Sequence, residues 1–173
     1  SMISSFKPAL DAAFKYSPAI VRKHKIEVEE REKREEIFLR TTTGKTVGIP
    51  IRVEESEAPI FFSYLYTRLK DLSVGYTERT EDIEEYPEEE YPDGKRVKRF
   101  KFRYIFLTDE TRYVIDNEIV VTKLPKADYY SLELVSTPAH GTQVPMKYID
   151  RVAVIVRDIT KGWLSERKRL LGV

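Results

Sequence analysis

The sequence predicts an α+β protein with a mainly antiparallel sheet or small β-barrel, one internal helix and a C-terminal helix packed on it. Three observations predict this: a charged hairpin signal in residues 78–107, several short alternating segments, and two stretches with helical spacing. A length of 173 residues suits a single domain, 1–173, with a subdivision into 1–75 and 76–173 as the alternative.

The hairpin of residues 78–107 turns at Asp93-Gly94, because Gly94 tolerates the positive φ that a tight turn requires. Its second arm alternates with a period of two, which predicts a strand with one buried face. Arg99, Lys101 and Arg103 share one face, and Phe100, Phe102, Tyr104 and Phe106 share the other.

Two registers of this hairpin are open. With a two-residue loop, the opposed pairs are Glu89 with Lys98, Glu88 with Arg99, and Glu84 with Arg103. With Pro92 in a three-residue loop, they are Glu90 with Arg96, Glu88 with Lys98, and Glu85 with Lys101. Either register opposes acidic to basic residues, so the hairpin is expected to neutralise its own charge.

Before this hairpin, Met2 to Lys15 predicts a short amphipathic helix. Residues 26–40 alternate at both ends and favour two strands joined by a charged turn, with a charged helix as the alternative. Residues 36–55 predict a second hairpin that turns at 43–45 and places Pro50 at a sheet edge.

The internal helix is expected from about Ala58 to Leu72, with Ser56 as its cap and Pro59 in its first turn. Phe61 belongs to its apolar stripe, and three further aromatic residues widen that stripe; all four serve either the core or a protein interface. These candidate interaction residues are Phe61, Phe62, Tyr64 and Tyr66.

The remaining segments predict further strands and a terminal helix. Strands are expected at 112–115, 118–124 (after a turn at Asp116-Asn117), 129–136 and around 149–156. A helix is expected from Thr160 to Val173, with Trp163, Leu164, Leu170 and Leu171 facing inward.

Composition excludes several classes of function. Thirty Lys and Arg residues against 29 Asp and Glu leave a net charge of +1, so no global field attracts a polyanion. The chain has no cysteine, which excludes disulfides and thiolate chemistry. Its single Asn and single Gln beside abundant charges are typical of thermophile proteins. No apolar run is long enough to span a membrane, so we expect a cytoplasmic protein.

The sequence contains little that indicates a catalytic site or a metal site. His140 lies in a loop near Ser136 and Thr142, but no nucleophile motif accompanies it. The carboxylates follow no metal-ligand spacing, and Asp116-Asn117 reads as a turn, so we expect no cofactor or metal.

The order of segments in residues 119–156 resembles an Sm-like small barrel. The order comprises a strand, a turn with Asp128, a strand with Leu132 and Leu134, and a closing strand at 149–156. Pleckstrin-like barrels have a similar order and also close with a C-terminal helix. The glycine expected in the first strand is absent, and Ser131 stands where an RNA-contacting Asn is expected, so no RNA-binding residues are carried over.

Three functions remain as hypotheses. The first is a non-catalytic interaction or assembly module that binds a protein partner or a second copy of itself. The second is an RNA- or single-strand-binding protein that uses the basic strand, namely Lys95, Arg96, Lys98, Arg99, Lys101 and Arg103. The third is a hydrolase or transferase with a site near His140.

Overall fold

The computed structural model describes residues 18–39, 41–140 and 142–173. It separates into two compact units, Ser1–Arg40 and Thr41–Val173, which are described individually. The predicted helix at Met2–Lys15 lies outside the described residues.

In the first unit, residues Pro18–Leu39 form one helix, α2. The prediction of two strands in this region was therefore wrong. Between Glu27 and Arg34 nearly every residue is Glu, Lys or Arg, and these residues have high helix propensity. The alternation at Ile26 and Val28 is too short to outweigh that propensity.

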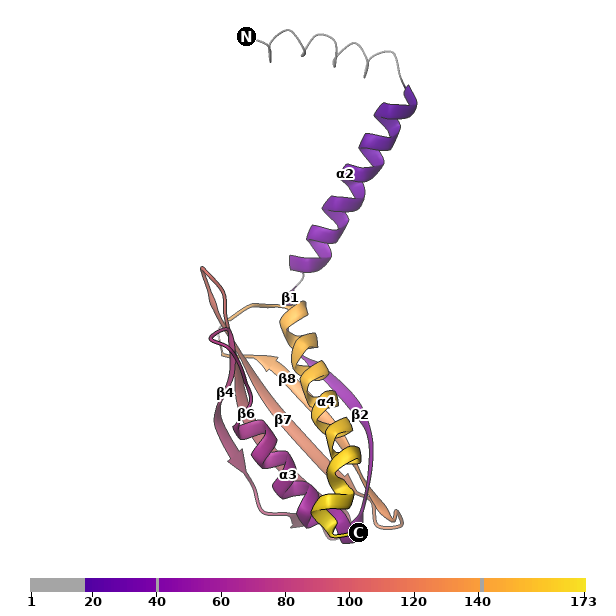
Figure 1. Ribbon diagram of the computed structural model, residues 1–173, viewed down its shortest axis with the longest axis vertical. Helices are drawn as coiled ribbons and strands as arrows, with labels where there is room; N and C mark the ends of the chain where they lie inside the picture. Colours follow the sequence, from indigo (N-terminus) through magenta and orange to yellow (C-terminus); the bar gives the residue numbers. More distant parts are fainter. Residues whose placement is uncertain (1–17, 40, 141) are drawn as a thin grey trace. The chain divides into compact units, whose positions relative to one another are not determined.

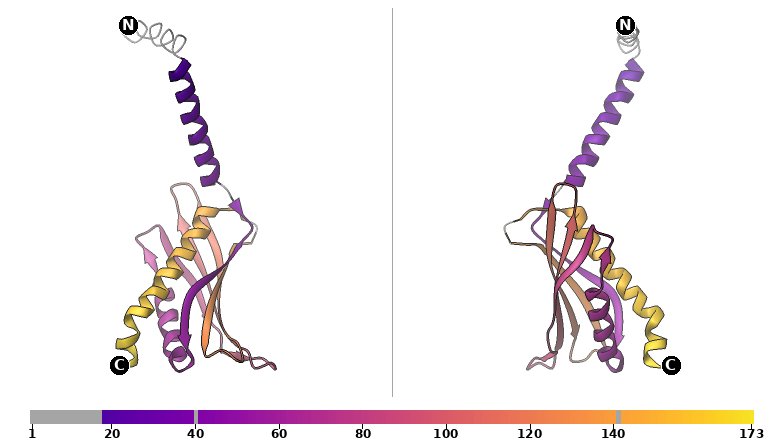
Figure 2. Two further views of the ribbon diagram at one scale, coloured as in Figure 1. Left: turned by 90° about the vertical axis from the view of Figure 1, so that its right-hand side faces the viewer. Right: turned by 60° about the vertical axis from the view of Figure 1, so that its left-hand side comes forward.

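The second unit is an antiparallel sheet that curls around two helices (Figures 1 and 2), which confirms the α+β class. The strands of the sheet are β2 (Lys45–Glu54), β3 (Ser73–Val74), β4 (Glu78–Glu85), β5 (Glu89–Glu90), β6 (Arg96–Leu107), β7 (Arg112–Lys123) and β8 (Tyr129–Pro138). Their order is β2-β8-β7-β6-β4-β3, and β5 pairs with β6. The two end strands, β2 and β3, do not pair with each other, so the sheet is open and curled and does not form a closed barrel.

The predicted second hairpin is wrong, because β2 pairs with β8 instead of its predecessor. Strand β1 (Thr41–Thr42) pairs with β9 (Val144–Pro145) in a separate ladder. Strand β8 offers ten residues whose alternation matches that of β2, whereas β1 has only two. The edge position of Pro50 is confirmed, and the register shifts beside it, between Ile49 and Val53.

The charged hairpin is confirmed. Near its tip Glu90 lies opposite Arg96, as a three-residue loop requires, and Gly94 has φ +92°. Between β5 and β4 the pairing slips by one residue, so Glu84 lies opposite Lys101, a pairing that neither predicted register contains. A second shift follows at a bulge between Glu81 and Glu84, where Asp82 adopts φ +53°.

Strand β7 runs without interruption through Asp116 and Asn117, so the predicted turn there is wrong. Asn117 is buried on the inner face of the sheet, where Ser136 Oγ donates a 2.7 Å hydrogen bond to its Oδ1 atom. The Asn117 amide donates to the Ile115 carbonyl oxygen at 3.1 Å. Because its polar atoms have these hydrogen-bond partners, the Asn117 side chain can be buried without contact with water.

The internal helix is α3 (Ala58–Lys70), preceded by a short 3₁₀ turn, Glu55–Glu57. The helix was predicted correctly, but its N-cap residue is Glu57 and not Ser56, and no side chain caps it. Pro59 lies in its first turn, as expected.

Residues Met146–Leu171 form a single helix, α4, so the strand predicted at 149–156 is wrong, and with it the Sm-like closing strand. The continuous apolar run 152–156 suggests a strand locally, but the buried residues follow helical spacing over a longer range. They are Ile149, Val152, Ala153, Ile155, Val156, Ile159, Thr160 and Trp163. Trp163 faces inward as predicted, whereas Leu164 and Leu170 are exposed.

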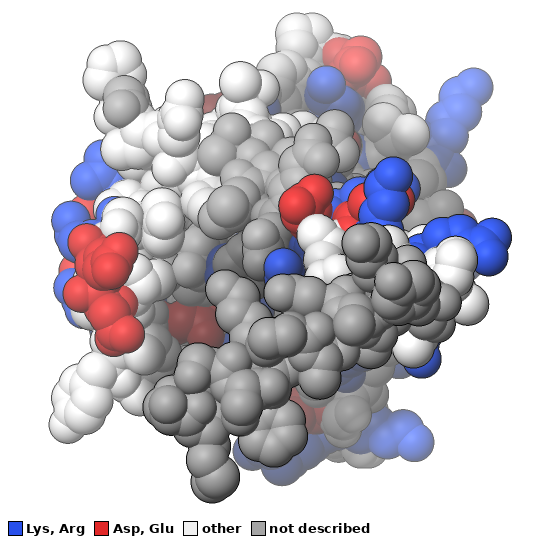
Figure 3. Space-filling model, turned by 90° about the horizontal axis from the view of Figure 1, so that it is seen from above, with Lys and Arg blue, Asp and Glu red and all other residues white. Residues whose placement is uncertain are grey.

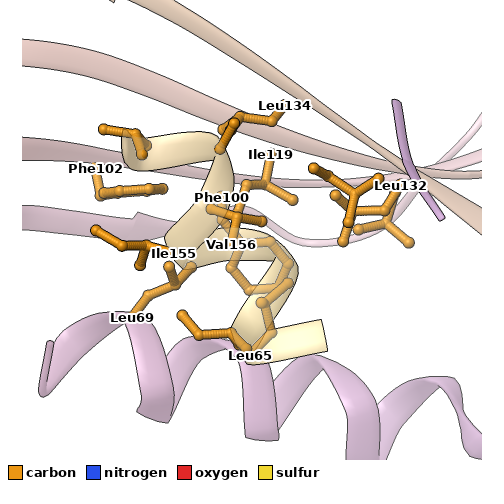
Figure 4. Packing of buried hydrophobic residues seen from close by; sticks show 14 of the residues in the cluster. Leu65, Leu69, Phe100, Phe102, Ile119, Leu132, Leu134, Ile155 and Val156 are labelled. Carbon is orange, nitrogen blue, oxygen red and sulfur yellow. The ribbon is translucent and has the colours of Figure 1, made fainter. Parts of the chain in front are cut away.

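Helices α3 and α4 cover the inner face of the sheet together (Figure 2). Leu65 and Leu69 of α3 point towards Ile155 and Val156 of α4, and the aromatic and aliphatic side chains of the sheet lie behind them (Figure 4). Elements on both sides of residue 75 belong to this one hydrophobic cluster.

Candidate interaction surface

The four aromatic residues of α3 lie mainly in the core. Phe61, Phe62 and Tyr64 are buried and Tyr66 is half-buried. The Phe61 ring packs edge-on against Trp163 with centroids 5.4 Å apart. Of the two roles considered for them, packing is the one that this geometry supports.

The basic strand β6 is matched by carboxylates along its length. Lys98 forms an ion pair with Glu85 at 2.9 Å, and Arg96 forms one with Glu88 at 2.7 Å and another with Glu55. Arg99 and Lys101 lie 2.5 and 3.8 Å from Glu118, and Arg103 lies 3.0 Å from Asp116. The Lys95 ammonium lies 4.7 Å from the centroid of the Tyr91 ring.

Three of the five ion-paired cations, Arg99, Lys101 and Arg103, pair with carboxylates of β7, a source that the sequence patterns did not indicate. Asp116 and Glu118 project from the outer face of β7 opposite Arg103 and Lys101. Hydrogen bonds to Tyr91 and Glu118 raise the pKa of Arg99, and the hydrogen bond to Glu88 raises the pKa of Arg96. Acidic and basic side chains also stand side by side in the view of Figure 3. Phosphate groups would have to compete with these carboxylates.

His140 is exposed in the loop after β8. No Asp or Glu of the described residues forms an ion pair or hydrogen bond with its ring. Within residues 18–39, 41–140 and 142–173, no group of His, Asp and Glu is arranged to hold a metal ion. No described helix is long and apolar enough to span a membrane.

Both edges of the sheet are poorly suited to strand addition. Pro50 removes a donor from edge strand β2 beside its register shift. On the opposite side, the bulge at Asp82 interrupts β4 where β3 no longer covers it. Bulges and prolines at such positions discourage pairing with another chain.

The helical layer carries an apolar groove between α3 and the C-terminal part of α4. It encloses about 300 Å³. We call it the α3–α4 groove; its lining residues are Ile60, Ser63, Tyr64, Thr67, Arg68, Glu166, Arg169 and Leu170. Ile60 is 40% exposed and Leu170 is 37% exposed, so both aliphatic side chains meet water.

Tyr64 forms the polar floor of this groove. Its hydroxyl donates a 2.7 Å hydrogen bond to the Ile159 carbonyl oxygen, and burial raises its pKa. Arg68 forms an ion pair with Glu166 across the groove, and its guanidinium lies 5.3 Å from the centre of the Tyr64 ring.

Beyond this ion pair, a second hollow of about 610 Å³ continues between the two helices. Leu72, Val74 and Ile155 line its apolar part, and Arg151 and Asp158 line its polar part. The two hollows offer a partner apolar contacts bordered by charges.

Searches of protein-family models, curated proteins and solved structures find no match to this chain.

Proposed function

We propose that the protein is a non-catalytic interaction or assembly module that binds a protein partner, in the first instance a second copy of itself, through the α3–α4 groove. The observation that carries the proposal is the pair of solvent-exposed aliphatic residues, Ile60 and Leu170, on the rim of a helical groove. Grooves of this kind receive apolar side chains of another helix.

Two further observations support this choice of surface. The sheet edges are interrupted by Pro50 and by the bulge at Asp82, which disfavours strand addition. The α3 aromatic side chains face the core, which leaves aliphatic residues to make external contacts.

Light scattering combined with size-exclusion chromatography tests the proposal over a range of protein concentrations. We expect the wild type to self-associate, and Ile60→Glu and Leu170→Glu to reduce association, because each places a charge in an apolar contact. Leu124→Glu is the matched control, since Leu124 is an exposed aliphatic residue in the β7–β8 loop.

A wild-type protein that stays monomeric at every concentration overturns the second copy as the partner. Equal association of Ile60→Glu, Leu170→Glu and Leu124→Glu overturns the groove as the contact surface. Identified partners that bind the wild type but not Ile60→Glu would support the groove with a different protein.

We propose further that the protein belongs to the cytoplasm of a thermophile. One Asn, one Gln and no Cys in 173 residues support this, because these side chains degrade at high temperature. We expect a thermal midpoint above the mesophile range of about 45–65 °C, measured by circular dichroism. A midpoint within that range would count against a thermophilic source.

A further inference from the structure

Helix α4 carries a second exposed surface on a different side from the groove. It consists of Val154, Arg157, Lys161, Leu164 and Lys168, which follow one another at spacings of three and four residues and therefore share one side of the helix. We call these five residues the α4 stripe. At a rise of 1.5 Å per residue it is about 21 Å long. None of the five lines the α3–α4 groove.

The three cations of the stripe differ from the other arginines of α4. Arg151, Arg167 and Arg169 each form an ion pair, with Glu78, Glu57 and Glu166 respectively. Arg157, Lys161 and Lys168 are exposed, and none forms an ion pair with a described carboxylate. Their charges are therefore available to a binding partner.

Two aliphatic side chains lie on the same side of α4 as these cations, Val154 before Arg157 and Leu164 between Lys161 and Lys168. Val154 is 41% exposed and Leu164 is 54% exposed. The stripe thus combines positive charge with apolar surface.

The charge of α4 differs in sign from that of the rest of the chain. The helix contains seven Lys and Arg residues and three Asp and Glu residues, a net charge of +4. Because the whole chain carries +1, the remainder carries −3. The net positive charge of the chain is therefore carried by this helix.

We propose that the α4 stripe binds a short acidic polypeptide segment that carries aliphatic side chains. Carboxylates of the segment pair with Arg157, Lys161 and Lys168, and its aliphatic residues pack on Val154 and Leu164. This goes beyond the proposed function, because it assigns a second surface and the chemistry of its partner.

Two features favour a polypeptide over a nucleic acid. A polyanion longer than the stripe would extend over a protein surface of net negative charge, whereas a segment of about 21 Å would not. Exposed Leu and Val contribute little to phosphate binding, which depends on charge, but they contribute directly to a protein interface.

Fluorescence anisotropy with three labelled probes tests the proposal: poly-L-glutamate, a glutamate–leucine copolymer and oligo-dT. We expect the wild type to bind the copolymer more tightly than the other two. Lys161→Glu/Lys168→Glu should weaken copolymer binding about tenfold, because two attractive pairs become repulsive. Leu164→Ser should weaken copolymer binding but leave poly-L-glutamate binding unchanged.

The matched control is Lys70→Glu/Lys126→Glu, which changes the net charge equally at two other exposed lysines and should bind like the wild type. Ile60→Glu should also bind the copolymer normally, which separates this surface from the groove. Equal weakening by both lysine pairs, or no copolymer binding by the wild type, overturns the proposal. Tighter binding of oligo-dT that depends on Lys161 and Lys168 overturns the assignment to a polypeptide.

Discussion

Tyr64 and Gly162 fix the distance between α3 and α4. A Cβ atom added at Gly162 would lie 2.6 Å from the Tyr64 hydroxyl oxygen but 3.9 Å from the adjacent ring carbon. The hydroxyl in turn donates to the Ile159 carbonyl oxygen one helical turn away. The close approach of the two helices, and hence the shape of the groove between them, depends on this contact.

Gly162→Ala is expected to destabilise the protein by about 1–3 kcal/mol, because the new methyl group overlaps the Tyr64 hydroxyl. In a Tyr64→Phe background the overlap disappears, and Gly162→Ala should become neutral or stabilising by up to about 1 kcal/mol, the gain in helix propensity. Urea unfolding of the four proteins of this double-mutant cycle measures the difference. Equal effects in both backgrounds would contradict the contact.

Ser136→Ala should cost about 1–3 kcal/mol, because the buried Oδ1 atom of Asn117 loses its hydrogen-bond donor. Replacing both partners, as in Asn117→Val/Ser136→Ala, should cost less than the sum of the two single changes, since no polar atom is left unpaired. Denaturant unfolding checks this. Strict additivity would show that the two side chains do not depend on each other.

Glu85→Ala should destabilise the fold by about 1–2 kcal/mol, because it leaves the buried Lys98 ammonium without its carboxylate. This loss of stability is smaller than the loss expected for breaking a fully buried ion pair, since water reaches the Glu85 side chain. Lys98→Met should destabilise the fold less. The Lys98 side chain lies close to the Phe62 and Phe100 rings, where an apolar Met side chain can pack. Thermal unfolding measures both variants, and a greater loss of stability in Lys98→Met than in Glu85→Ala would contradict this interpretation.

Stability should fall as the pH rises above 10. Burial, and then the negative charges and hydrogen bonds of Glu78 and Glu88, raise the pKa of Tyr104 and of Tyr130 above the ordinary value of 10.0. Folding therefore favours the neutral hydroxyls: their contribution is fully present below pH 10 and is lost as the pH climbs towards the raised values.

Denaturant unfolding at a series of alkaline pH values measures this decline. Tyr130→Phe should make it shallower, because one raised pKa disappears. Tyr76→Phe should leave the slope unchanged, since Tyr76 is 95% exposed. A wild-type stability that does not change above pH 10 would contradict the burial of these hydroxyls.

Predictions from the sequence were most accurate where the alternation of polar and apolar residues within a single strand was sufficient to identify it. The alternation of Phe100 and Phe102 with Arg99 and Lys101 located both faces of β6, and the Asp93-Gly94 turn located the hairpin. Such patterns are local, so no knowledge of neighbouring strands is needed.

Prediction failed where distant residues decide the local structure. Asn117 resembles a turn residue until Ser136, on the neighbouring strand, supplies a hydrogen bond. The run 152–156 resembles a strand because five apolar residues in a row hide the helical spacing that 149 and 163 reveal. In both cases tertiary contacts outweigh local preference.

The α3–α4 groove was not visible in the sequence for the same reason. The groove exists because Ile60 and Leu170, more than a hundred residues apart, meet on adjacent helices. The spacing from Val154 to Lys168 was present in the sequence, but it indicates a common side only if residues 149–156 are helical. A longer window over the C-terminal segment would have revealed it.

The proline in β2 and the bulge in β4 also limit how this protein can aggregate. When two copies meet at their sheet edges, β2 lacks the backbone N–H group of Pro50, and β4 is interrupted by its bulge. The ladder of backbone hydrogen bonds therefore does not continue from one molecule to the next. Fibrils with a cross-β core would first require the sheet to unfold, and a concentrated solution of the native protein should therefore remain free of them.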